Sequence, residues 1–207
     1  RLLRLLAETQ IPKVFLDTSS LVAPDELNGD LLLMESRTSV RRITCHLLEQ
    51  GRTLPGFIGD ISYAQSNRER YEGFCQALAD AGKKVDSSLC LTTPLGIDTY
   101  REEIDTFLSS LSRMPDAFVC ASDYVACILM QLLEKRGLRV PEDVAVSGFD
   151  NNTEDLLAEH LTTVQVFNEE LGARLALQIL YRIKYPNTPH EITYLGTNVL
   201  YRDSTGD

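Results

Sequence analysis

Acidic and hydroxyl side chains recur at the points where the predicted β-strands of this chain end. Asp17, Ser122 and Asp150 each follow such a strand, and Ser66 and Arg70 lie at the start of the helix after another strand. In open parallel sheets, ligands bind beyond the carboxyl ends of the strands, beside helix N-termini. Carboxylates accept hydrogen bonds and arginine donates several in a planar fork, so together they can read hydroxyl and carbonyl groups. These five residues predict a site for a small polar molecule.

The same residue types also have a purely structural interpretation. Asp and Ser after a strand often do no more than cap a helix or form a turn. Ser122 and Asp123 can each cap the helix that follows, and Arg70 has Glu69 and Glu72 close by on a helix that could be solvated. The functional interpretation depends on several such positions falling at one edge of one sheet, not on any single residue.

The sequence lacks the common catalytic and metal-binding motifs. No G-x-G-x-x-G, P-loop, H-E-x-x-H or G-x-S-x-G pattern occurs in it. The histidines, His46, His160 and His190, are scattered over a predicted helix, a loop and a strand start, which argues against a histidine base or a metal cluster. We therefore predict no enzyme activity, no metal and no cofactor.

Predicted strands and helices alternate along the chain. The predicted strands are Lys13–Leu16, Asp30–Met34, Leu54–Ile58, Ser88–Leu91, Asp116–Ala121, Val144–Phe149, Thr162–Val166, Glu191–Leu195 and Asn198–Tyr201. The predicted helices are Arg37–Gln50, Ser66–Ala81 with Ser66 as N-cap and Glu69 completing a capping box, Asp98–Arg113, Tyr124–Arg136, Glu154–Glu159 and Asn168–Lys184. This alternation predicts βαβ units and parallel sheets, so the expected fold class is α/β and doubly wound.

Composition limits the possible partners and the compartment. The 207 residues suffice for one large domain or two small ones, and no apolar stretch is long enough to cross a bilayer. The net charge of -10 leaves no electrostatic footprint for nucleic acid, so DNA binding would need another segment. Five cysteines without a C-x-x-C pair favour reduced thiols in a cytoplasmic protein. The chain opens in mid-helix without an initiator methionine, so we expect it to be a fragment.

The helix predicted from Tyr124 to Leu133 is apolar on more than one face. Such a helix is either sunk in a core or shared between the sheet and a second subunit. We favour the second interpretation, which predicts a homodimer with two-fold contacts.

Several stretches of the sequence resemble a known family. MPDAFVCASDYVACILMQLLEKRGLRVPEDVAVSGFDN, then LTTVQVFNEELGARLALQIL and the closing YRDST, resemble the effector-binding core of the LacI/GalR family of bacterial transcription regulators. Upstream, IPKVFLD, CHLLEQGRTLPGFIGD and SNRERYEGFCQALADAG are similar to the preceding segments of that family in the same order. The resemblance covers nearly the whole chain.

The resemblance implies a periplasmic-binding-protein-like fold of type I, with two doubly wound parallel-sheet subdomains and an effector bound between them. The N-terminal subdomain is expected to be incomplete, and the DNA-binding headpiece is expected to lie outside this chain. The expected parts are residues 1–91 for the N-terminal subdomain, 92–165 plus 166–190 for the C-terminal subdomain, and 191–207 for closing strands that cross back.

By position, the five candidate residues match places from which family members contact an effector. Arg70 fits the R-x-x-G-[FWY] pattern of the family and Asp150 is the aspartate of its G-F-D. Two departures concern the ligand. Ser122 stands where the family usually has asparagine, and Val166-Phe167 replaces polar or proline residues. These changes argue against assuming a lactose-like or galactose-like effector.

The sequence thus predicts the effector-binding and dimerisation core of a cytoplasmic transcription regulator of the repressor type. Its partners would be a sugar or similar small polar metabolite, a second copy, and DNA only through the headpiece, with no membrane contact. One alternative is a periplasmic sugar-binding protein of a transport system. A second is an enzyme that uses Asp17 and Asp150 with a metal in phosphoryl transfer.

Overall fold

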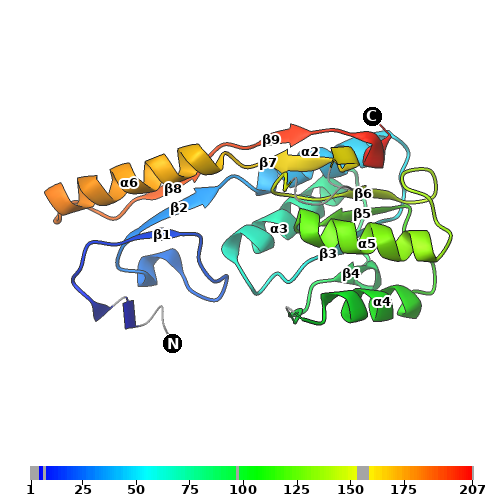
Figure 1. The fold of residues 1–207 in the computed structure, drawn as a ribbon, viewed down its shortest axis with the longest axis horizontal. Helices are drawn as coiled ribbons and strands as arrows, with labels where there is room; N and C mark the ends of the chain where they lie inside the picture. Colours follow the sequence, from blue (N-terminus) through cyan, green and yellow to red (C-terminus); the bar gives the residue numbers. More distant parts are fainter. Residues whose placement is uncertain (1–4, 7, 97, 153–158, 207) are drawn as a thin grey trace.

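The computed structural model describes residues 5, 6, 8–96, 98–152 and 159–206. In this part of the chain, strands and helices alternate and build two parallel sheets that lie end to end (Figure 1). The predicted α/β fold is therefore confirmed. The short helix predicted from Glu154 to Glu159 lies almost wholly outside the described residues. Among the described helices, none is both long enough and apolar enough to cross a membrane.

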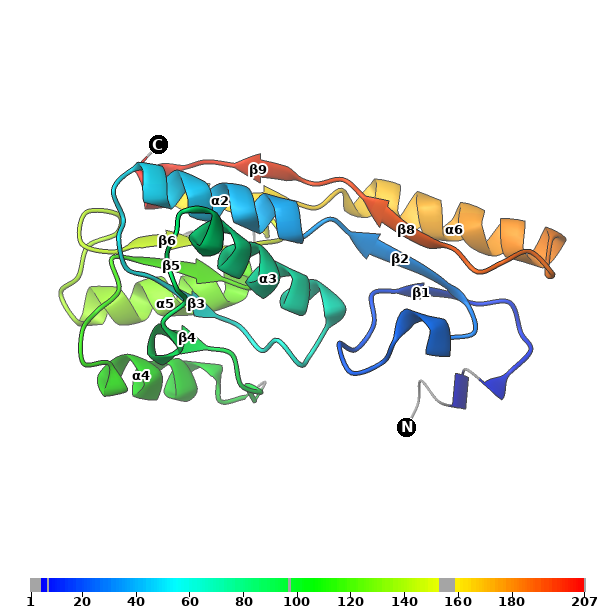
Figure 2. The same cartoon turned by 180° about the vertical axis from the view of Figure 1, so that it is seen from behind.

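The first sheet has the strand order β1-β2-β8, with parallel pairing throughout. Its strands are β1 (Val14–Leu16), β2 (Asp30–Met34) and β8 (Ile192–Leu195). The central strand β2 is buried over its first four residues, as its apolar run predicts. Helix α6 (Asn168–Lys184) lies along this sheet in both views (Figures 1 and 2).

The second sheet has the strand order β4-β3-β5-β6, again with parallel pairing. Helices cover both of its faces, with α2 and α3 nearer the viewer in Figure 2 and α5 nearer the viewer in Figure 1. The elements are α2 (Arg37–Glu49), β3 (Pro55–Ile58), α3 (Gln65–Asp80), β4 (Cys90–Leu91), α4 (Tyr100–Ser110), β5 (Ala117–Cys120), α5 (Asp123–Lys135) and β6 (Ala145–Ser147).

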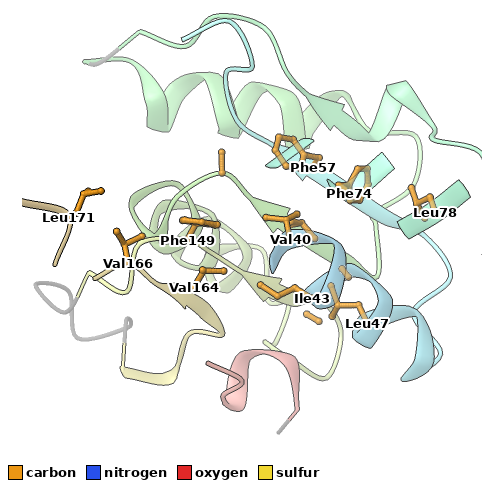
Figure 3. Packing of buried hydrophobic residues seen from close by; sticks show 14 of the residues in the cluster. Val40, Ile43, Leu47, Phe57, Phe74, Leu78, Phe149, Val164, Val166 and Leu171 are labelled. Atoms are coloured by element: carbon orange, nitrogen blue, oxygen red, sulfur yellow. The ribbon is translucent and has the colours of Figure 1, made fainter. Parts of the chain in front are cut away.

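Alternate residues of β5 enter the cores on opposite faces of the second sheet. Ala117 and Val119 pack in a cluster with α2 and α3, whereas Phe118 and Cys120 pack in a cluster with α4 and α5. Burial on both faces is what a continuous apolar strand requires. Figure 3 shows the first cluster, which extends beyond the end of β6 to Phe149. The residue before the predicted site residue Asp150 is thus part of the core.

The chain crosses between the sheets where β2 runs into α2, where β7 (Thr163–Gln165) runs into α6, and where β8 runs into β9 (Asn198–Leu200). β7 and β9 pair with each other in antiparallel fashion. Of the two closing strands, β8 thus belongs to the first sheet and β9 to the antiparallel pair beside the second. These crossings are the only covalent links between the sheets among the described residues.

The expected boundary at residue 91 does not follow the sheets. β3 and β4 precede it, yet they pair within the second sheet, because the chain already changes sheet after Met34. Helix α6 lies along the first sheet, although residues 166–190 were expected in the C-terminal subdomain. Sheet membership depends on which strand edges meet, and sequence order alone does not specify this. We propose a first subdomain of residues up to 34 plus 168–195, and a second of residues 35–165 plus 198–206.

The predicted N-cap of α3, Ser66, lies two residues after the observed one, and the predicted capping box does not form. The helix begins at Gln65, with Ala64 in the N-cap position and no side-chain cap. The hydroxyl of Ser66 donates instead to Asp17, and Glu69 accepts from the Gln65 side chain. A contact with the other subdomain has replaced the local cap.

The remaining predicted helices differ from the structure mainly at their ends. α4 begins at Tyr100 rather than Asp98, with Thr99 as its N-cap residue. α5 matches within one residue, because Ser122 accepts from the Val125 amide at 3.3 Å and Gly137 adopts a φ of 74° after the helix. The local signals at α5 therefore acted as predicted.

Most apolar side chains of α5 are buried within a single chain, although Tyr124 is 58% exposed and Met130 is partly buried. None of its buried apolar residues is more than 7% exposed, and they pack against the second sheet and α4. The prediction that one face of α5 is left for a second subunit is therefore wrong. The surplus of apolar residues is explained by packing on several sides within the fold.

Candidate functional site

The predicted site residues gather where the carboxyl ends of the two sheets face each other. Asp17 follows β1 of the first sheet, whereas Ser122 and Asp150 follow β5 and β6 of the second. Helix α3, which carries Ser66 and Arg70, begins at the same edge (Figure 1). The two subdomains thus each contribute polar groups to one region, as the strand-end argument predicts.

Arg70 is almost completely buried, with 4% of its surface exposed. Its Nη1 donates to the backbone oxygen of Ala121, and its Nη2 donates to Asp150 Oδ1 at 3.4 Å. The guanidinium carbon lies 3.6 Å from the centre of the Phe149 ring, which is a cation–π contact. No described residue accepts from the buried Arg70 Nε. Arg70 is therefore fixed in place with one donor unused.

Carboxylates outnumber cations around Arg70. Burial lowers the pKa of Arg70, whereas Asp150, Asp17, Asp123 and Glu69 raise it. Burial likewise raises the pKa of Asp150, and the charge of Arg70 lowers it. A guanidinium stays protonated at neutral pH. With several acceptors and one cation, the site favours a ligand rich in hydroxyl donors over an anion.

The turn after β6 directs Asp150 toward Arg70. Asp150 and Asn151 have φ angles of 109° and 51°, which non-glycine residues rarely adopt. The buried carboxylate of Asp123 accepts from the Asn152 amide at 2.7 Å and from the Thr163 hydroxyl at 2.6 Å. These bonds anchor the turn to α5 and β7. Asp123 is therefore a positioning residue for Asp150.

Asp123 gives the protein a specific pH dependence. Burial raises its pKa to about 6, from 3.8 for an unperturbed carboxyl. Between these values the folded state binds more protons than the unfolded state, so stability falls as pH rises. Between pH 4 and pH 7, we expect the free energy of unfolding of the wild type to fall by about 2 to 3 kcal/mol relative to that of Asp123→Asn. Urea unfolding at each pH measures this difference. Identical pH slopes in the two proteins would contradict the buried, proton-binding carboxyl.

Asp17 and Ser66 join the two subdomains. The Ser66 hydroxyl donates to Asp17 Oδ2 at 2.6 Å, and the Thr18 amide donates to Asp17 Oδ1 at 2.7 Å. The Gln65 amide donates to the backbone oxygen of Thr18 at 2.7 Å. The end of β1 therefore lies against the first turn of α3, and this arrangement, with the two subdomains in contact, is called here the closed arrangement.

A second contact between the subdomains lies outside the predicted site. The phenol of Tyr194 on β8 donates to Glu69 on α3 at 2.7 Å, and Glu69 is only 3% exposed. Tyr194→Phe removes this hydrogen bond and keeps the ring. It should destabilise the closed arrangement, relative to an open one, by about 1 kcal/mol. Small-angle scattering should then show a larger radius of gyration for Tyr194→Phe than for wild type. Tyr181→Phe on α6 is the matched control, and equal radii in all three proteins would show that the bond does not hold the subdomains together.

Ser122 is the predicted site residue with the strongest structural role. Its hydroxyl oxygen caps α5 by accepting from the Val125 amide, and among the described residues no hydrogen bond links it to the other four candidates. The backbone oxygen of the adjacent Ala121 accepts from Arg70. Ser122 therefore lies beside the Arg70 and Asp150 pair, with its hydroxyl proton free of the capping bond.

Sequence reasoning missed some of the residues that build the site. Phe149 is the last residue of a predicted buried strand, although it also precedes Asp150 and supports Arg70. Asp123 was considered only as a possible cap, and the signal for its role lies in Gly148. A Cβ at Gly148 would lie 2.2 Å from Asp123 Oδ1, so glycine there permits the close approach. The glycine at position 148 can be interpreted in this way only when the contact between its segment and Asp123 is known.

The arrangement of the side chains does not support the alternative of an enzyme that uses Asp17 and Asp150 with a metal. Among the described residues, no group of three or more His, Cys, Asp or Glu side chains is placed to hold a metal ion. Asp150 pairs with Arg70, and Asp17 accepts from Ser66 and Thr18.

Comparison with known proteins identifies the family to which this fold belongs. The sequence matches the periplasmic binding protein-like domain family over residues 44–205. It is 31% identical over 81% of its length to the HTH-type transcriptional regulator DegA of Bacillus subtilis, covering 48% of that protein. It is 27% identical over 97% of its length to the HTH-type transcriptional repressor PurR of Vibrio cholerae, covering 59% of it. The chain thus spans only about half of the length of these relatives.

A solved structure supports the same assignment. The complex of the transcriptional regulator CelR with cellobiose has a TM-score of 0.81 at 28% identity, with 92% of this chain and 58% of that chain covered. The family match covers most of the described fold, and the named relatives are transcription regulators. The chain therefore belongs to the periplasmic binding protein-like domain family, and its relatives and structural neighbours include LacI-family transcription regulators.

Proposed function

We propose that this chain is the effector-binding core of a transcription regulator, and that a sugar or similar small polar metabolite binds between its subdomains. The ligand residues would be Asp17, Ser66, Arg70, Ser122 and Asp150. The observation that carries the proposal is the pairing of strand-end carboxylates with one buried arginine at the meeting of the two sheets. The cellobiose bound by CelR supports a sugar as the ligand class.

The proposed chemistry follows from the donors and acceptors. Asp17 and Asp150 accept hydrogen bonds from ligand hydroxyl groups, and Arg70 Nε donates to a ligand oxygen. Bonds between charged and neutral groups contribute about 1.5 to 3 kcal/mol each, so two or three of them suffice for micromolar affinity when apolar contacts add to them. The surplus of carboxylates disfavours phosphorylated ligands.

The proposed regulation uses the crossings between the subdomains as hinges. A ligand that touches Asp17 and Arg70 together binds the closed arrangement better than an open one, and this difference in affinity shifts the population. In a longer polypeptide with a DNA-binding headpiece, the shift would change how two headpieces meet DNA. Repression by the relative PurR is consistent with such a role. The periplasmic transport alternative is not favoured, because the named relatives are transcription regulators.

A homodimer remains part of the proposal, although α5 no longer supports it. Helix α6 has an exposed apolar stripe, with Leu177, Leu180 and Ile183 between 59% and 62% exposed. A second copy can cover this stripe, and so can a further segment of a longer polypeptide. Sedimentation of the chain and of Leu180→Glu separates these possibilities. A dimer that dissociates on substitution supports the homodimer through α6, whereas a wild-type monomer contradicts it.

The proposed function is tested by a ligand screen. Neutral monosaccharides and disaccharides, sugar phosphates and nucleobases are added to the chain, and the melting temperature is measured. At 100 times its Kd a ligand adds about 2.7 kcal/mol, which raises the melting temperature of a protein of this size by about 5 to 10 °C. We expect this shift for a neutral hydroxylated ligand and its loss in Asp150→Ala. If no compound raises the melting temperature, or if the shift persists in Asp150→Ala, the proposal is wrong.

A further inference from the structure

Tyrosine side chains gather at the edge of the second sheet that carries the proposed site. Tyr63 lies in the loop after β3, Tyr100 is the first residue of α4 after β4, and Tyr124 lies in the first turn of α5 after β5. β3 is the neighbour of both β4 and β5 in the sheet. These three residues, called here the tyrosine shelf, therefore occupy adjacent positions along one edge.

The tyrosine shelf presents aromatic surface to solvent. Tyr63 is 72% exposed and Tyr124 is 58% exposed, whereas Tyr100 is half-buried. The rings of Tyr100 and Tyr124 are 5.7 Å apart and nearly perpendicular, at 87°. In this edge-to-face arrangement the two rings support each other, and the Tyr124 residue stays largely exposed to solvent. The burial of Tyr100, together with the charge of Asp60 and the proximity of Tyr63 and Tyr124, raises the pKa of Tyr100.

Asp60 adds a hydrogen-bond acceptor beside the tyrosine shelf. Its Oδ1 accepts from the Ser62 amide at 2.8 Å, from the Ser62 hydroxyl at 2.6 Å and from the Tyr63 amide at 3.2 Å. These bonds fix the carboxylate and the loop that carries Tyr63. No described residue donates to Asp60 Oδ2. A hydroxylated ring can donate a hydrogen bond to the free oxygen of this fixed carboxylate. Its apolar face can pack on the exposed aromatic rings.

The tyrosine shelf is continuous with the proposed site. Tyr124 lies two residues after Ser122, and β5 pairs with β6, which leads to Asp150. The tyrosine shelf and the pair of Arg70 and Asp150 therefore both lie at the carboxyl-end edge of the second sheet.

We propose that Tyr63, Tyr100 and Tyr124 form a second subsite, which takes the second sugar ring of a disaccharide or glycoside. This rests on the proposed function of the cleft. The C–H face of a sugar ring is apolar and packs on an aromatic face, while its rim hydroxyls donate to Asp60 Oδ2 and exchange hydrogen bonds with the phenols. Exposed tyrosines suit this task because each ring joins an apolar body to a polar tip.

The test compares each disaccharide with its component monosaccharides by calorimetry on this chain. The probes are cellobiose with glucose, maltose with glucose, lactose with glucose and galactose, and sucrose with glucose and fructose. For the disaccharide that binds, we expect at least about 10-fold tighter binding than for its components. Tyr124→Ala and Tyr63→Ala should each reduce the ratio of disaccharide to monosaccharide affinity by about 5-fold to 10-fold. Tyr181→Ala on α6 is the matched control, because Tyr181 is also exposed but lies on the first subdomain.

The possible outcomes separate this proposal from the proposed function. If sugars bind in an Arg70-dependent way without preference for a disaccharide, the proposed tyrosine subsite is contradicted, whereas the proposed binding between the subdomains is supported. If no sugar binds while another polar metabolite does so through Arg70, the subsite is again wrong and the cleft stands. If nothing binds through Arg70, both are wrong. A ratio that falls equally in Tyr181→Ala also contradicts the subsite.

Discussion

Replacing Arg70 by alanine is expected to lower effector affinity by about 100-fold. The substitution removes the buried donor Nε, the contact with Asp150 and the cation–π contact with Phe149. A loss of two charge-assisted contacts of about 1.5 kcal/mol each corresponds to this factor. It also leaves Asp150 without its ion-pair partner, which weakens the ordering of the site. Calorimetry with the sugar that gives the largest melting-temperature shift measures the effect.

Two further variants keep this prediction falsifiable if Arg70→Ala folds poorly. Arg70→Met retains most of the volume of the buried stem and should lose nearly as much affinity. Arg41→Ala removes an exposed arginine of α2 whose partner is Asp80, and it should change affinity by less than about 2-fold. Circular dichroism checks the fold of each variant. Folded Arg70→Ala and Arg70→Met with wild-type affinity would show that Arg70 does not bind the ligand.

The largest expected effect on stability concerns the ion pair of Arg182 and Asp30. Arg182 on α6 is 2% exposed and Asp30 at the start of β2 is 1% exposed. Arg182 Nε donates to Asp30 Oδ2 at 3.1 Å, Nη2 donates to Oδ1, and Gln178 also donates to Oδ2 at 2.7 Å. Burial alone would raise the pKa of Asp30, but hydrogen bonds from Arg182, Gln178 and the Glu191 amide outweigh it and lower the pKa. The pair holds α6 to the first sheet.

Arg182→Met is expected to destabilise the protein by about 3 to 5 kcal/mol, because it leaves a buried carboxylate without its cation. Urea unfolding at pH 7 measures this loss. The double variant Asp30→Asn with Arg182→Met removes both charges and keeps one oxygen acceptor, so it should recover most of the stability. A single variant with wild-type stability, or a double variant less stable than the single one, would contradict the account of this pair.

Local signals in the sequence predicted most elements of the fold, and their failures have a common cause. β2 and α6 have the predicted ends, because apolar runs, acidic first turns and closing prolines act within a few residues. Sheet membership was not predicted, because β3 joins β5 across about 60 residues of chain and α6 returns to β1. The missing side-chain cap of α3 also results from a long-range contact, because the Ser66 hydroxyl donates to Asp17 on the other subdomain.

The candidate site shows the same division between local and long-range information. Strand-end positions identified Asp17 and Asp150, the start of the following helix identified Arg70, and the structure brings these residues to one region. Their supports could not be predicted, because the contact of Phe149 with Arg70 and the anchoring of the Asp150 turn by Asp123 link distant segments. For Ser122 the structural interpretation, a helix cap, is confirmed, and its contact with a ligand stays a prediction.

The central claim is that one small polar ligand is held by both subdomains at once. A crystal structure of the chain with the best sugar from the screen tests this most directly. The account predicts a ligand within hydrogen-bond distance of Asp17 or Ser66 on one side and of Arg70 or Asp150 on the other, with Arg70 Nε donating to a ligand oxygen. A ligand that contacts only one subdomain, or that lies away from Arg70, would contradict it.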